Sequence, residues 1–247
     1  MRKKSPLLSP DLRDKGDMQY VWLIWSLILV AIWFATYLCV RSKVERKEML
    51  IVSTWTSLLG LTEPLFVPSY WSPPSLFDLS ARTGFDIESF IFAFAAGGLV
   101  FALYQLFFHK KHARMSGMSR HALRHRFHYV VILSVPIIII GLLIWTNLNP
   151  IYDFIIAGVI GGFLSLYCRP DLGKKMVVSA GLFLGVYYAY FLTLIAMSPG
   201  YVERVWNLKA ISGIIITGIP LEELLFAVVL GFYWSSVYEH LSWLQIK

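Results

Sequence analysis

Acidic residues beside long apolar segments are the side chains of this 247-residue sequence best suited to chemistry. Glu222 and Glu223 are adjacent at the start of one apolar run, Asp86 and Glu88 open an earlier run, and Glu63 ends another. When carboxyl groups share a dry site, one stays protonated while a neighbour ionises, which places an acid and a base in one pocket. The chemistry predicted here is proton transfer.

A structural role is the alternative for these acids. Pro220 suits the first turn of a helix, and Glu222 and Glu223 would then stabilise that turn through the helix dipole. The helix dipole favours the ionised carboxyl by roughly 1 kcal/mol, whereas full burial disfavours the ionised form by several times more. In a dry site, proton transfer is therefore the better interpretation of a repeated acidic pair.

The segments that position these acids are predicted to be transmembrane helices. Hydrophobic residues make up 57% of the chain and charged residues 15%, against about 25% charge in soluble domains. The apolar runs approach the roughly 20 residues that cross a bilayer core. We expect an all-α polytopic membrane protein, which excludes a soluble enzyme, a disordered chain and a disulfide-rich secreted domain. The seven predicted spans cover residues 18–40, 49–61 (extended toward Glu48 or Glu63), 87–108, 127–145, 151–168, 176–197 and 220–241.

Basic residues set the predicted orientation. The net charge of +7 does not indicate nucleic-acid binding, because the Lys and Arg residues lie in short loops between the apolar runs. Segment 41–48 holds four Lys or Arg residues, 109–126 six and 169–175 three, whereas the other loops between helices hold three. The positive-inside rule then places the N terminus outside and the C terminus in the cytoplasm of a multi-pass membrane protein. Five basic residues in the polar arm 1–17 argue against this orientation. The acids of the basic loops, Glu45, Glu48 and Asp171, are expected to be solvated.

Histidine-rich and cysteine patterns give little support for a metal. Five of the six histidines lie in or beside segment 109–126, and the cysteines Cys39 and Cys168 form no CxxC pair. We expect that no carboxylate or cysteine joins these histidines, and the neighbouring arginines would repel a cation. The sequence also lacks the GxGxxG, Walker A, HExxH and GxSxG motifs. We therefore predict neither a metal nor a cofactor.

An internal repeat relates the two halves of the chain. Segment 85–92 resembles 219–226, so that Glu88 aligns with Glu222, and Trp71 and Trp206 precede these glutamates by 17 and 16 residues. The offset of four helices is even, so both halves cross the membrane in the same sense. The predicted organisation is a polar arm (1–17), repeat 1 (18–108), a basic loop with a linking helix (109–146) and repeat 2 (147–247).

Aromatic residues surround the acids. Such rings often anchor proteins at the membrane interface, but beside a proton donor they also stabilise a carbocation through the ring quadrupole. The candidate substrate-binding residues are Phe66, Trp71, Asp86, Phe92, Trp206 and Phe226.

Three segments together resemble the small integral-membrane lycopene cyclases, here in the fused form of archaea and fungi. They are Pro-Leu-Glu-Glu at 220–223 with Phe226, Glu-Pro-Leu-Phe-Val-Pro-Ser-Tyr-Trp at 63–71, and Phe-Asp-Ile-Glu at 85–88. The resemblance implies redox-neutral cyclisation of the ψ-end groups of a linear carotenoid in the bilayer, without a cofactor. It implies catalytic roles for Glu222, Glu223, Glu88 and Glu63. One departure is Ser69, where many relatives carry an acid.

Two other functions fit the sequence less well. A membrane transporter would have polar residues or helix breaks at mid-membrane, whereas these helices are apolar through their middles. A non-catalytic carotenoid-binding subunit would bind the same pigment without changing it. The sequence leaves open the ring type, a C40 or C50 substrate, one or two rings, and whether the chain forms a homo-oligomer or a complex with other carotenoid enzymes.

Overall fold

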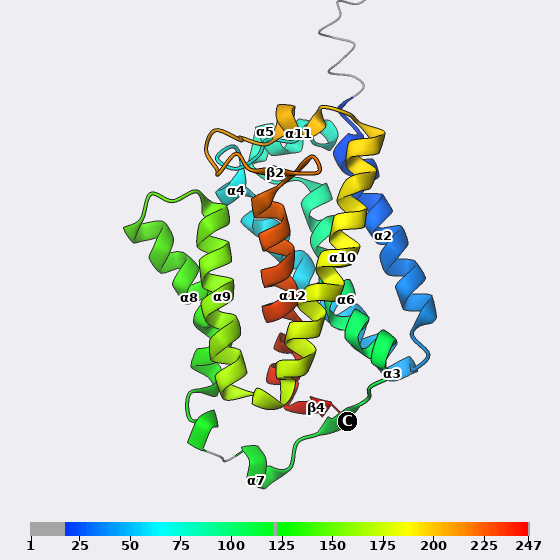
Figure 1. Ribbon diagram of the computed structural model, residues 1–247, viewed down its shortest axis with the longest axis vertical. Coiled ribbons are helices and arrows are strands. Elements are labelled where there is room, and N and C mark those ends of the chain that lie inside the picture. Colours follow the sequence, from blue (N-terminus) through cyan, green and yellow to red (C-terminus); the bar gives the residue numbers. More distant parts are fainter. Residues whose placement is uncertain (1–17, 121–122, 247) are drawn as a thin grey trace, which may run out of the picture.

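The protein is a bundle of apolar helices, and in Figure 1 the long helices run roughly along the vertical axis of the view. The structure is a computed structural model that describes residues 18–120 and 123–246. Within these residues, seven helical segments are long and apolar enough to cross a membrane, which confirms the predicted all-α polytopic class. The spans are α2 (Val21–Cys39), α3 (Lys43–Ser57) continued by η1 (Leu58–Thr62) and α4 (Glu63–Phe66), α6 (Ile87–Phe108), α8 (His128–Trp145), α9 (Pro150–Cys168), α10 (Gly173–Met197) and α12 (Leu221–Ser242).

The second span differs most from its predicted range of 49–61. The span covers Lys43–Phe66 and is 24 residues long. Compared with the predicted range, it has an additional polar turn at its start, and it continues through the 3₁₀ helix η1 into α4 at its end. Ser42 caps the start, since its side chain accepts a hydrogen bond from the Glu45 backbone N–H at 3.4 Å. The extension at both ends brings Glu63 into the span.

Short elements close each end of the bundle (Figure 1). Near the start of α2 lie η2 (Leu76–Asp78), α5 (Leu79–Thr83), α11 (Tyr201–Val205) and the paired strands β2 (Ile215–Ile216) and β3 (Ile219–Pro220). At the opposite end lie β1 (His112–Arg114), α7 (Gly117–Arg120), η3 (Leu123–His125), η4 (Pro170–Leu172) and β4 (Leu244–Ile246). There β1 of the basic loop pairs antiparallel with β4 near the C terminus, so part of this loop is ordered against the bundle.

The two halves of the bundle pack in similar ways. Helix α6 packs against α2 and α3, and α12 packs against α9 and α10. At equivalent positions, Gly97 of α6 lies against Thr56 of α3, and Gly231 of α12 lies against the backbone of Ala180 in α10, where an added Cβ would collide. Helix α8 packs mainly against α9. The origin of the halves in a duplication stays a prediction.

A pair of aromatic residues joins the halves toward the end of the bundle where α2 begins. Trp25 of α2 and Tyr190 of α10 stack with ring centroids 4.4 Å apart. The Trp25 indole N–H donates to the Tyr190 carbonyl at 3.1 Å, and the Tyr190 hydroxyl donates to the Trp25 carbonyl at 3.0 Å. This reciprocal pair fixes α2 against α10, and Trp25 also lines the cavity described next.

Candidate active site

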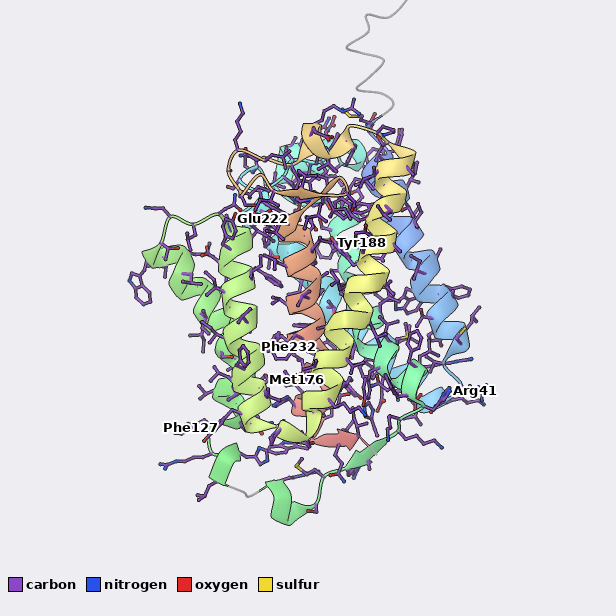
Figure 2. The ribbon with its side chains drawn as sticks, viewed as in Figure 1. Arg41, Phe127, Met176, Tyr188, Glu222 and Phe232 are labelled. Carbon is purple, nitrogen blue, oxygen red and sulfur yellow. The ribbon has the colours of Figure 1, made fainter. Side chains whose placement is uncertain are left out.

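The acidic residues singled out in the sequence gather at one end of the bundle. In Figure 2, Glu222 lies at the end opposite Arg41 and Phe127. Helices α6, α9 and α12 begin at this end, and α4 lies beside them. The six acids on these elements are all buried: Glu63, Asp86, Glu88, Asp153, Glu222 and Glu223. Asp153 accepts a 3.5 Å hydrogen bond from Thr146.

An apolar cavity of about 560 Å³ lies beside these acids and between the two halves. Its wall follows α12 from Glu223 to Val237, a rise of about 21 Å at 1.5 Å per residue. Side chains of α8, such as Pro136 and Ile140, and residues of α3 and η1 also line the cavity. Among the described residues, no Lys or Arg lines the cavity. The cavity therefore suits a long apolar molecule lying along the helix axes.

Glu223 presents a carboxylate to this cavity and is held by three donors. Its Oε1 accepts hydrogen bonds from the Tyr70 hydroxyl at 2.6 Å and the Trp206 indole N–H at 2.9 Å, and its Oε2 accepts from the Tyr187 hydroxyl at 2.5 Å. Tyr70 keeps its proton, because burial and the neighbouring Glu223 hold the pKa of its phenol well above its ordinary value. Donors to both oxygens stabilise a carboxylate without any cation.

Glu63 faces the same cavity from the other half of the chain. Its side chain is 7% exposed, its Oε1 has no hydrogen-bond partner among the described residues, and it lines the cavity with Ser89 and Trp71. It interacts electrostatically with Asp86 and Glu88. Each half thus contributes one cavity acid, but from different positions. In the proposed repeat, Ser89 stands where the second half has Glu223.

Glu88 and Glu222 are directed toward loops and do not line the cavity. Glu88 Oε1 accepts a 2.7 Å hydrogen bond from the Leu76 backbone N–H. Glu222 Oε1 accepts from the Ser212 backbone N–H at 2.9 Å and from the Tyr152 hydroxyl at 2.7 Å. Both glutamates therefore fix the loop that precedes their own helix.

Five of the six predicted substrate-binding residues line the cavity: Phe66, Trp71, Phe92, Trp206 and Phe226. The indole rings of Trp71 and Trp206 contact each other at 5.3 Å, and the backbones of these residues form a bridge between the halves. Asp86 does not line the cavity but caps α6, where its Oδ1 accepts from the Ser89 N–H at 2.5 Å. Burial raises the pKa of the Asp86 carboxyl.

The structure adds cavity residues that the sequence did not indicate as ligand-binding, namely Trp22, Tyr70 and Tyr187. Tyr70 belongs to the segment 63–71 that carries the family resemblance, so a signal for it was present. Tyr187 lies inside α10, in a run of apolar and aromatic residues without a distinguishing pattern. Ser69 is exposed, and its carbonyl accepts from the Asn149 side chain at 2.9 Å, so it lies outside the cavity lining.

Buried charges at the opposite end are paired with one another, which corrects the expectation that Glu48 is solvated. His112 joins Glu48 Oε2 at 2.7 Å and Glu239 Oε1 at 2.8 Å, and Lys175 forms a short ion pair with Glu239. Burial lowers the pKa of His112, but hydrogen bonds and charges from Glu239 and Glu48 outweigh it and raise the pKa to about 9. We name these four residues the ionic cluster.

The histidines of the basic loop also have partners that the sequence did not reveal. Two carboxylates accompany His112 in the ionic cluster, and Cys168 lies beside His125 and His128. The expectation that neither a carboxylate nor a cysteine joins these histidines was therefore wrong. His121 lies outside the described residues.

Comparison with known proteins gives a match, which lies in the second half of the chain. Residues 149–241 match the family model described as lycopene cyclase. This segment contains α9, α10 and α12 with Trp206, Glu222 and Glu223. Neither curated proteins nor solved structures include a significant match to the chain. The second half of the chain is therefore similar to this family.

Proposed function

We propose that this chain, whose residues 149–241 match the lycopene cyclase family model, converts linear ψ-end groups of a carotenoid into rings by a proton-initiated isomerisation. The enzyme class would be that of an intramolecular lyase or isomerase. The observation that supports this most is that two acids, Glu63 and Glu223, face one apolar cavity walled by aromatic rings.

Glu63 is the proposed proton donor. Burial of a carboxyl whose Oε1 has no hydrogen-bond partner among the described residues costs less free energy when the group is neutral than when it is charged. The proton adds to the terminal double bond of the ψ-end group and leaves a tertiary cation. The indole rings of Trp71 and Trp206 stabilise positive charge through their faces, and the apolar wall keeps water from trapping the cation as an alcohol.

Glu223 is the proposed base. The next alkene attacks the cation and closes a six-membered ring, which moves the positive charge onto the ring. The Glu223 carboxylate, oriented by Tyr70, Tyr187 and Trp206, removes one ring proton and restores a double bond. One proton enters and one leaves, so the product is an isomer of the substrate and no redox cofactor takes part.

The length of the cavity supports a substrate that lies along the bundle. One end group would sit between Glu63 and Glu223, and the polyene would extend along α12 toward Val237. Entry from the lipid between α8 and η1 suits this substrate, because both elements contribute apolar side chains to the cavity wall. By the positive-inside rule, the acid end faces outward and the end with the ionic cluster faces the cytoplasm.

The test is expression of the chain in cells that accumulate lycopene, followed by chromatography of the pigments. The wild-type chain should yield cyclic product. Glu63→Gln and Glu223→Gln should each lower its formation by about 10²–10⁴-fold, the usual contribution of a general acid or base. Glu203→Gln is the matched control, because Glu203 is exposed on α11 at the same end. Linear pigment retained by a folded wild-type protein would instead identify a binding subunit and refute the proposal.

Positioning residues should behave differently from the two cavity acids. Glu88→Gln and Glu222→Gln keep an oxygen that can accept from Leu76 and Ser212, so we expect partial activity, lowered by roughly tenfold through looser loops. A loss as complete as that of Glu223→Gln would move the proton-transfer role to these residues.

A further inference from the structure

Three side chains of types that often bind metals meet at the end of the bundle opposite the candidate active site. His125 of η3, His128 at the start of α8 and Cys168 at the end of α9 are all buried, and one ligand atom from each lies within 4.8 Å of the others. We name these residues the thiol–imidazole cluster. They come from three segments that adjoin only in the folded chain.

The distances in the cluster match a known metal geometry. Cys168 Sγ lies 3.4 Å from His125 Nδ1 and 3.5 Å from His128 Nδ1. A tetrahedral zinc ion with Zn–S near 2.3 Å and Zn–N near 2.0–2.1 Å separates sulfur from nitrogen by about 3.5 Å. Only small movements would therefore be required to bind an ion between these atoms.

A hydrogen bond to His128 orients its ring for ligation. His128 Nε2 lies 3.1 Å from the carbonyl oxygen of His240, and only a protonated Nε2 can donate there. In the neutral ring this leaves the lone pair of Nδ1 directed at Cys168, the arrangement that metal-binding histidines commonly use. Trp243 stacks on the His128 ring at 3.9 Å and contacts the His125 ring at 5.3 Å, which covers the cluster.

Arg169 disfavours positive charge near His128, but its own charge is paired with a carboxylate. The neighbouring Arg169 is buried, but its guanidinium makes hydrogen bonds of 2.8 and 2.7 Å to the two carboxylate oxygens of Asp171. Ionisation of Cys168 would supply a further negative charge. Thiolate with imidazole suits zinc and other soft ions, and disfavours Mg²⁺ or Ca²⁺.

We propose that His125, His128 and Cys168 bind one Zn²⁺ ion, which fastens the basic loop to the ends of α8 and α9. Binding forms one Zn–S and two Zn–N bonds and releases the Cys168 thiol proton to solvent. The fourth position is available to water or to another ligand. The role is structural, and it does not depend on the proposed cyclase activity.

The experiment titrates metal-free full-length protein in detergent with Zn²⁺ and with Co²⁺. The wild type should retain one equivalent of zinc after desalting, and Co²⁺ should produce a thiolate-to-cobalt charge-transfer band. Cys168→Ser and His125→Ala should lose both signals. Cys39→Ser is the matched control, because Cys39 is the exposed cysteine at the end of α2 and should change neither.

Thiol labelling on the Cys39→Ser background keeps the test decisive if the Cys168 variant does not fold. Cys168 should react at least tenfold more slowly with Zn²⁺ than after chelation, since the metal occupies its sulfur. Wild-type protein that retains no zinc, gives no cobalt band and labels equally fast with and without metal would overturn the proposal.

Discussion

Buried carboxyls at the two ends of the bundle have different partners. In the ionic cluster, Glu48 and Glu239 are paired with His112 and Lys175. At the candidate active site, Glu223 has only phenol and indole donors, and no described cation lines the cavity beside it. Neighbouring cations stabilise the ionised form of a carboxylate, so such a carboxylate takes up a proton poorly. A carboxylate whose hydrogen-bond donors are neutral can gain and lose a proton more readily. We therefore expect the ionic cluster to contribute to stability and the acids at the candidate active site to transfer protons.

Removing the lysine of the ionic cluster should have the largest effect on stability. Lys175→Met leaves buried Glu239 without its closest cation, and breaking such a pair costs about 3–5 kcal/mol. The midpoint of thermal unfolding in detergent should fall accordingly. Lys174→Met, at the exposed neighbouring position, should change the unfolding free energy by less than about 0.5 kcal/mol. An equal loss of stability in the two variants would mean that the buried ion pair contributes no more than an exposed lysine does.

The ionic cluster should also make stability depend on pH. The pKa of His112 is about 9 in the folded protein against an ordinary 6.5, so the charged form is favoured by folding. Its contribution is complete below pH 6.5 and is lost as the pH rises through 9, and it amounts to about 3 kcal/mol at most. Unfolding midpoints measured from pH 6 to about 10 should fall in the wild type more than in His112→Gln. Parallel curves would contradict the pairing.

At the active-site end, a change to one donor should alter rate more than stability. Tyr187→Phe removes the hydrogen bond to Glu223 Oε2, and a bond to a charged group is worth about 1.5–3 kcal/mol. Expressed fully in the barrier, this lowers cyclic product formation in membranes by roughly 10–100-fold. Tyr188→Phe is the control, since Tyr188 bonds to Thr217 outside the cavity. An unchanged rate in Tyr187→Phe would remove Glu223 from the mechanism.

The smallest effect is expected at Ser69, where the sequence departs from the family pattern. Its side chain is exposed and outside the cavity lining, so Ser69→Asp should change the unfolding free energy by less than about 0.5 kcal/mol and leave the pigment profile unchanged. A change in product ratio would show that this loop contacts the substrate.

Hydropathy was sufficient to predict the membrane helices because a spanning segment must satisfy its backbone hydrogen bonds internally and expose apolar side chains. Segment 87–108 has the predicted bounds, and the others differ by few residues. The second span was predicted too short, since its first turn is polar and its last turn contains Pro64. Local composition could not show that these turns continue the helix.

The acids of the site were recognisable in the sequence, but their individual roles were not. Successive residues on an α-helix point about 100° apart, so the sequence alone could not show which of Glu222 and Glu223 faces the cavity. Packing of α12 against α9 and α10 turned Glu223 toward the cavity and Glu222 toward the loop. The partners of Glu223 come from positions 70, 187 and 206, and no local pattern links them.

Composition and charge patterning alone determined that the chain crosses the membrane several times and gathers acids at one boundary, because these properties follow from each segment's own transfer free energy. Contacts between segments distant along the chain decided the rest. Only the fold brought Glu63 to the same cavity as Glu223, buried Lys175 against Glu239, and joined Cys168 to two histidines of the basic loop.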